Sequence, residues 1–188
     1  MLNRLVTNWV YGGFLAGILL LLLAPALVRS WAPVPTVAFL CLPVYMIHQY
    51  EEHDNDRFRL VLNRTVGHGR DVLSPLAVFI INVPGVWGII WLSILLTVFI
   101  NGGFALIALY LLLVNALAHI VQALRLREYN PGLVSAIVLF LPLGIYGLIE
   151  VQRSGDGTVA MHLTGLFVAI AIHAAILIHV KRQASAVQ

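Results

Sequence analysis

The densest group of chemically capable side chains lies at residues 48–53, which read HQYEEH, at the end of an apolar stretch. On a helix, His48 is three residues from Glu51 and four from Glu52, so both pairs project from adjacent turns of one face. An imidazole and a carboxylate placed in this way can bind a metal ion between them. His53 is five residues from His48 and points elsewhere on an ideal helix, so it would join the site only if the helix ended or bulged there. We therefore expect His48, Glu51 and Glu52 to be metal ligands, with a spare glutamate as the catalytic base.

Other polar residues interrupt the apolar runs further along the chain. Asn115 and His119 are four residues apart and share one helical face, and His173 lies in the last apolar run. We expect His119 and His173 to complete the set of metal ligands. Five more residues are expected to orient ligands or substrate: Asn82, Asn115, Asn130, Ser135 and His53.

The depths of these residues in a membrane point to a common site. At 1.5 Å per residue, His119 lies about 9 Å before Arg125, and His173 about 12 Å before Lys181. Asn82 falls at a similar depth on a neighbouring run. Ionisable groups are costly inside a membrane and usually serve a function there. Polar groups from several helices in one layer therefore predict a shared site, whereas separate interhelical hydrogen bonds are the simpler alternative.

The composition shows which elements must position these residues. Of the 188 residues, 61% are hydrophobic and only 10% are charged, against about 25% charged residues in a soluble domain. The chain is therefore expected to be an all-α integral membrane bundle, forming a single domain over residues 1–188. The first apolar run is expected to be a retained helix and not a signal peptide. Six stretches are long and apolar enough to span a membrane: Asn8–Val28, Val34–His53, Ser74–Ile100 with a kink at Pro84, Phe104–Leu126, Pro131–Val151 and Thr158–Val180.

The distribution of positive charge supports six spans. With six spans both termini lie on one side, which would be cytoplasmic because it carries nearly all the basic residues. We therefore expect a multi-pass protein of a bacterial plasma membrane. Residues 54–72 form the only long loop, which could lie on the cytoplasmic interface as a short helix or serve as a solvated connector. The basic residues on the predicted cytoplasmic side are Arg4, Arg57, Arg59, Arg64, Arg70, Arg125, Arg127, Lys181 and Arg182, whereas only Arg29 and Arg153 lie on the other.

Three short motifs resemble those of the HXXEE-domain family of small membrane proteins. The His-x-x-Glu-Glu pattern is His48 to Glu52, the Asn-x-x-x-His pattern is Asn115 to His119, and an Asn-Pro-Gly follows at residues 130–132. Order and spacing agree, and the resemblance covers nearly the whole chain. It implies a membrane enzyme and supports the site, but it does not indicate a reaction or a substrate.

The chemistry expected of this site depends on a metal. The single cysteine, Cys41, excludes a cysteine cage. Nitrogen and oxygen ligands suit zinc or iron, as one or two ions. One ion with an open position would activate water for hydrolysis, whereas two ions bridged by glutamates would suit oxidation. The His-Glu-x-x-His pattern of zinc proteases is absent.

Our leading prediction is a metal-dependent membrane enzyme that acts on a lipid or another apolar substrate entering from the cytoplasmic leaflet. Two alternatives remain open at this point. A desolvated His-Glu pair could transfer protons in a metal-free isomerase, or the chain could be a proton or metal transporter. We expect membrane lipid and an apolar small molecule as partners, and no nucleic acid.

Overall fold

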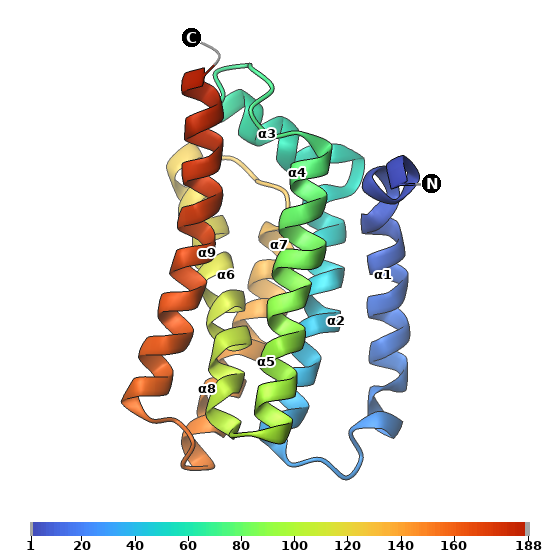
Figure 1. Cartoon of the computed structure of the whole chain (residues 1–188), viewed down its shortest axis with the longest axis vertical. Helices are drawn as coiled ribbons and strands as arrows, with labels where there is room; N and C mark the ends of the chain where they lie inside the picture. The colour runs from blue at the N-terminus through green and yellow to red at the C-terminus, as the bar shows by residue number, and fades with distance from the viewer. Residues whose placement is uncertain (1, 187–188) are drawn as a thin grey trace.

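The computed structural model describes residues 2–186 and is a bundle of roughly aligned helices (Figure 1). Within that range it contains no strand, so the predicted all-α fold is confirmed. The elements labelled η are not α-helices: η1 and η3 are 3₁₀ helices, and η2 and η4 are π-helices. The elements in chain order are α1 (Leu2–Leu27), α2 (Pro33–His53), η1 (Asp54–Asp56), α3 (Arg57–Thr65), α4 (Pro75–Ile80), η2 (Ile81–Trp87), α5 (Gly88–Phe99), η3 (Gly102–Phe104), α6 (Ala105–Leu126), α7 (Leu133–Ser135), η4 (Ala136–Phe140), α8 (Leu141–Arg153) and α9 (Val159–Ala186).

Within residues 2–186, five helical stretches are long and apolar enough to cross a membrane, as expected of a membrane protein. Their outer faces carry many exposed leucine, isoleucine, valine and phenylalanine side chains, which is the surface that lipid requires. The five stretches are Leu2–Leu27, Pro75–Phe99, Gly102–Leu126, Leu133–Arg153 and Val159–Ser185.

The predicted second span forms helix α2, which differs from the other five. It is not among the stretches apolar enough to cross a membrane on composition alone. It packs against α1, α5, α6 and α8, and twelve of its 21 residues are buried. Because its neighbours shield α2 from lipid, it can carry the polar residues of the site in its last two turns.

Two prolines lie in or next to a π-helix. At the predicted kink, Pro84 lies within the π-helix η2, which joins α4 to α5. A second π-helix, η4, directly precedes Pro142 at the start of α8. Proline cannot donate a backbone hydrogen bond, and the wider π-turn accommodates the disturbed hydrogen-bond pattern. Neither π-helix was predicted from the sequence.

Small residues allow the helices to approach closely. A side chain built on Gly17 of α1 would lie 2.9 Å from the carbonyl oxygen of Pro43, on α2. One on Gly165 of α9 would lie 2.6 Å from the carbonyl oxygen of Leu106, on α6. Membrane helices pack by such close contacts because lipid gives them no hydrophobic drive to associate. We call the end of the bundle opposite the chain termini the outer end. The glycines therefore allow α1 to pack closely against α2, and the half of α9 nearer the outer end to pack closely against α6.

The chain after α2 forms the short helix α3. Asn63 of α3 holds the segment that leads from α3 to α4. The side-chain oxygen of Asn63 accepts hydrogen bonds from the backbone N–H groups of Val72 and Leu73. Helix α1 begins and α9 ends near the same end of the bundle, where α3 also lies (Figure 1). The cytoplasmic orientation of that end, and the position of α3 at the membrane interface, stay predictions.

Candidate metal centre

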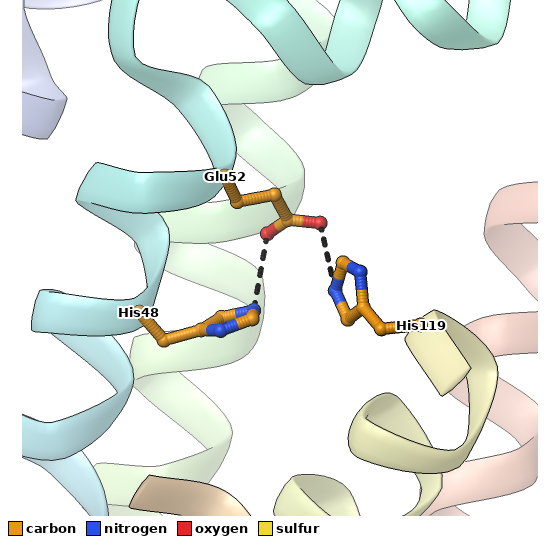
Figure 2. A group of neighbouring side chains, drawn as sticks. All are labelled: His48, Glu52 and His119. Atoms are coloured by element: carbon orange, nitrogen blue, oxygen red, sulfur yellow. Dashed lines mark ion pairs between the residues drawn. The ribbon is translucent and has the colours of Figure 1, made fainter. Parts of the chain in front are cut away.

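Three buried side chains from α2 and α6 converge near one end of the bundle. His48 and Glu52 lie one turn apart on α2, and His119 faces them from α6 (Figure 2). Their exposed fractions are 0%, 5% and 4%. The polar turn of α2 thus lies against the polar face of α6 in the structure.

The distances within this group leave room for a metal ion, with each imidazole beside a different oxygen of Glu52. Nε2 of His48 lies 3.6 Å from Oε2 of Glu52, and Nε2 of His119 lies 3.5 Å from Oε1 (Figure 2). Charge-assisted hydrogen bonds are shorter, at about 2.7–2.9 Å. Tetrahedral ligands at bond lengths of about 2.0–2.2 Å are separated by about 3.3–3.6 Å. With one ligand atom from each residue lying within 4.8 Å of the others, the group could hold a metal ion.

The protonation of His48 leaves its Nε2 free to bind a metal. Its Nδ1 lies 2.9 Å from Oγ of Ser135. The Ser135 hydroxyl donates its proton to the Glu51 carboxylate, so its oxygen accepts the proton of His48 Nδ1. In the neutral ring Nε2 is then an unprotonated acceptor, and it is buried with no hydrogen-bond partner among residues 2–186. A cation between this nitrogen and the carboxylate would satisfy both groups.

His119 is held in the same protonation state by a different residue. Its Nδ1 lies 2.6 Å from Oδ1 of Asn130. The Asn130 amide nitrogen donates to the backbone oxygen of His119, which fixes the direction of the amide. Nδ1 of His119 therefore carries a proton, and Nε2 faces Glu52, where it could bind a metal in the neutral ring. Such partners of metal-binding histidines orient the ring and tune its affinity.

Gly132 is the residue that allows both rings to lie against the chain between α6 and α7. Its φ is +97°, which glycine adopts readily. A Cβ atom there would lie 2.7 Å from Cε1 of His119 and 2.9 Å from Cε1 of His48. The Asn130-Pro131-Gly132 segment thus contributes the hydrogen bond between Asn130 and the His119 ring and the close packing of Gly132 against both rings.

Glu51 faces away from the three-residue group and binds the start of α7. Its carboxylate accepts hydrogen bonds from the backbone N–H of Val134 at 3.1 Å and of Ser135 at 2.7 Å. It also accepts from the hydroxyls of Ser135 and Tyr129. A carboxylate at a helix N-terminus satisfies free N–H groups and interacts favourably with the helix dipole. Burial and the bond to Glu51 raise the pKa of Tyr129, which keeps this hydroxyl a donor.

His53 lies beside the group, on the same side as α3. Its Nε2 is 3.2 Å from Oε2 of Glu52. Its ring packs against Trp9 and Phe58, with centroids 5.2 Å away in each case. Helix α2 ends at His53, which is the condition under which this residue could join the site.

A cavity of about 560 Å³ opens next to the group, between α2, α3, η2, α6 and α9. Glu52, His53 and His119 line its wall, and most of the remaining wall is apolar. His173 also lines the cavity, and its Nδ1 lies 2.8 Å from the backbone oxygen of Ala169. Because a carbonyl only accepts, Nδ1 carries the proton and Nε2 is unprotonated.

The predicted site residues take four positions in the structure. His48, Glu52 and His119 form the group itself. Asn130 and Ser135 form hydrogen bonds to its imidazole rings. The cavity wall contains Asn82, Asn115, His53 and His173, whereas Glu51 binds the start of α7. The metal-binding roles of Glu51 and His173 stay predictions. Sequence reasoning missed Tyr45, a buried cavity residue whose hydroxyl contacts Asn115, because an aromatic residue in an apolar run gives no signal.

The fold and the site together define a helical membrane protein with a buried His-Glu-His group. The chain belongs to the family described as "Protein of unknown function with HXXEE motif", whose model matches residues 39–147. The resemblance seen in the sequence is thus confirmed, and the matched segment contains the whole His-Glu-His group and the residues that hold its rings. No curated protein and no solved structure matches the chain significantly.

Proposed function

We propose that this protein is a membrane-embedded, metal-dependent hydrolase that acts on a lipid-like substrate. The observation that carries the proposal is the grouping of three buried ligand residues, two of which, Glu52 and His119, line the wall of a mostly apolar cavity. Nε2 of His48 lies 3.6 Å from Oε2 of Glu52, which is longer than a charge-assisted hydrogen bond, and a metal ion bound by both atoms would satisfy them.

One divalent ion, with zinc as the first choice, fits the ligands best. Two imidazoles and one carboxylate are the protein ligands of many catalytic zinc sites, which keep a fourth position for water. Oxidation at two iron ions needs further carboxylates that bridge them. Glu51, the nearest other carboxylate on α2, already accepts four hydrogen bonds. We therefore assign hydrolysis in preference to oxidation.

The residues of the cavity supply the remaining steps. The metal would lower the pKa of its bound water, and Nε2 of His173 would accept the proton that this water loses. The water oxygen then forms a bond to the carbonyl carbon of an ester or amide, and the bond from that carbon to the leaving oxygen or nitrogen breaks. The proton moves from His173 to the leaving group, which yields an acid and an alcohol or amine.

The location of the cavity determines the class of substrate. Several of its lining residues on α6 and α9 are also exposed on the outer surface of the bundle, among them Val121 and Leu177. In a membrane these residues face lipid, so an apolar molecule can enter from the bilayer. We propose the plasma membrane of a bacterium as that bilayer, with the basic end of the bundle in the cytoplasm.

The test is hydrolysis of 4-nitrophenyl palmitate by the full chain in detergent micelles, with zinc added. We expect activity in the wild type, none in Glu52→Gln, and a loss of about 100-fold in kcat with retained metal in His173→Gln. His179→Gln is the matched control, because His179 lies on the same helix and is exposed. Absence of ester and amide hydrolysis in metal-loaded wild type, or full activity in Glu52→Gln, would contradict the proposal. Full activity after removal of all metal would instead favour a proton-transfer enzyme.

A further inference from the structure

The cavity extends past the metal centre to a second polar pair, Asn115 and Tyr45. Asn115 lies on α6 one turn from His119, or about 6 Å along the axis. Its amide nitrogen donates to the Tyr45 hydroxyl at 3.1 Å. Both residues line the cavity, and their exposed fractions are 9% and 3%.

The side-chain oxygen of Asn115 has no partner among the described residues. Leaving such an acceptor buried costs about 1–3 kcal/mol. Turning the amide over does not remove the cost, since the nitrogen would then be left with free protons. The nearby wall of the cavity is apolar and includes Leu111, Val86 and Ile172, so these residues offer no hydrogen bond.

Another set of hydrogen-bonded polar side chains beside the cavity is complete, in contrast to Asn115. Gln49 donates to Oδ1 of Asn82 at 2.8 Å and accepts from Nε1 of Trp87. The Asn82 amide nitrogen donates in turn to the backbone oxygen of Val78 at 2.9 Å. These residues link α2 to the π-helix η2 and leave no free group. Asn115 lines the same cavity, and its Oδ1 is left without a partner among the described residues.

The free groups of the pair define what they can bind. The Tyr45 hydroxyl accepts from Asn115 and keeps its own proton to donate, whereas Oδ1 of Asn115 can accept. A hydroxyl group both donates and accepts, so it satisfies both residues. An ester or ketone oxygen only accepts, and a hydrocarbon chain does neither.

We propose that Asn115 and Tyr45 bind a hydroxyl group on the substrate, about one helical turn from the group that meets His48, Glu52 and His119. The substrate is then a hydroxylated lipid, whose apolar chain continues past the hydroxyl along Leu111 and Ile172. This inference rests on the proposed function only in taking the cavity as the substrate site.

The test compares lipids that differ in a single hydroxyl group. Palmitate, 3-hydroxypalmitate and 5-hydroxypalmitate compete with a dansyl-labelled fatty acid for the full chain in detergent micelles. We expect one of the hydroxy acids to bind about tenfold tighter than palmitate, because a polar site discriminates against a ligand that leaves it unpaired. The ratio of hydroxy acid affinity to palmitate affinity should fall to about one in Asn115→Leu and in Tyr45→Phe, while palmitate binding is retained.

Tyr110→Phe is the matched control, because it removes a hydroxyl that bonds to His162 at the other end of the bundle. It should keep the preference for the hydroxy acid. Equal binding of palmitate and both hydroxy acids would overturn the proposal and would show that only water occupies the pair. A preference that survives in both cavity variants would also overturn it. Metal content measured on the same samples separates this result from the proposed function, because the hydroxyl preference does not require hydrolysis.

Discussion

The two ends of the bundle use histidine in opposite ways. At the outer end, Nδ1 of His162 on α9 lies 2.8 Å from the hydroxyl of Tyr110 on α6. There Gly165 lets α9 lie directly on Leu106 of α6. At the other end α6 and α9 line the cavity, and His48 and His119 each direct Nε2 at the Glu52 carboxylate. At the tightly packed end, His162 links two helices by a hydrogen bond. Beside the cavity, His48 and His119 instead place Nε2 atoms where they could bind a metal ion.

Adding a methyl group at Gly132 should have the largest effect on metal affinity, whereas the same change at the outer end should have none. Gly132→Ala places a Cβ against both imidazoles, so we expect metal affinity to fall by about 100-fold. Gly155→Ala is the matched control, because Gly155 also has a positive φ, +83°, but a Cβ there meets nothing within 4 Å. Both variants should lose about 1–2 kcal/mol of unfolding free energy from the backbone alone. Competition with a chromogenic chelator measures the affinity, and equal affinities in the two variants would show that Gly132 has no role in positioning the rings.

Neutralising Glu51 should have the next largest effect. Glu51→Gln replaces an acceptor of four hydrogen bonds by an amide that must direct protons at the same donors. The start of α7 and the Ser135 contact to His48 should loosen, which lowers metal affinity by about 10–100-fold. Glu150→Gln removes a glutamate that pairs with the exposed Arg153 at the outer end and should leave the affinity unchanged. If zinc titrations gave the same affinity for Glu51→Gln as for wild type, Glu51 would have no part in holding the site.

Removing the Ser135 hydroxyl should weaken the site by a smaller amount. Ser135→Ala takes away the oxygen that accepts from Nδ1 of His48, but it leaves the ring packed against Phe140, with centroids 4.2 Å apart. We expect metal affinity to fall by about tenfold. Ser154→Ala, in the outer loop, is the control and should match wild type. An affinity unchanged by Ser135→Ala would mean that packing alone orients His48.

The smallest effect is expected at the outer histidine. His162→Phe removes one hydrogen bond to Tyr110 on a partly exposed surface, so the unfolding free energy should fall by about 1 kcal/mol or less. Metal content should match wild type. Loss of metal in this variant, with the fold intact by circular dichroism, would contradict the assignment of the site to the opposite end.

The sequence predicted the all-α fold correctly, but α2, the second of the six predicted spans, is not among the five helices apolar enough to cross a membrane. The structure also brings polar residues of α2 and α6 together. Apolar runs and turn residues determine where spans begin and end, and the shared depth of His48 and His119 placed both at one level of the membrane. The two π-helices were not predicted, because the effect of Pro84 and Pro142 depends on how neighbouring helices accommodate them.

The division of labour between the two glutamates could not be predicted. Glu51 and Glu52 are adjacent in sequence and both lie within one turn of His48, so spacing treats them alike. What separates them is the rotation of α2 in the bundle, which directs Glu52 to the cavity and Glu51 to the N-terminus of α7. That rotation is determined by contacts such as Gly17 against Pro43, between residues far apart in the chain.

The central claim is that His48, Glu52 and His119 bind a metal ion, and elemental analysis tests it most directly. The wild-type chain, His162→Phe and Glu52→Gln are loaded with zinc, freed of excess metal by gel filtration and analysed for zinc per chain. The site predicts about one tightly held zinc in the wild type and in His162→Phe, and none in Glu52→Gln. A folded wild type without metal, or a Glu52→Gln variant that retains it, would contradict the claim.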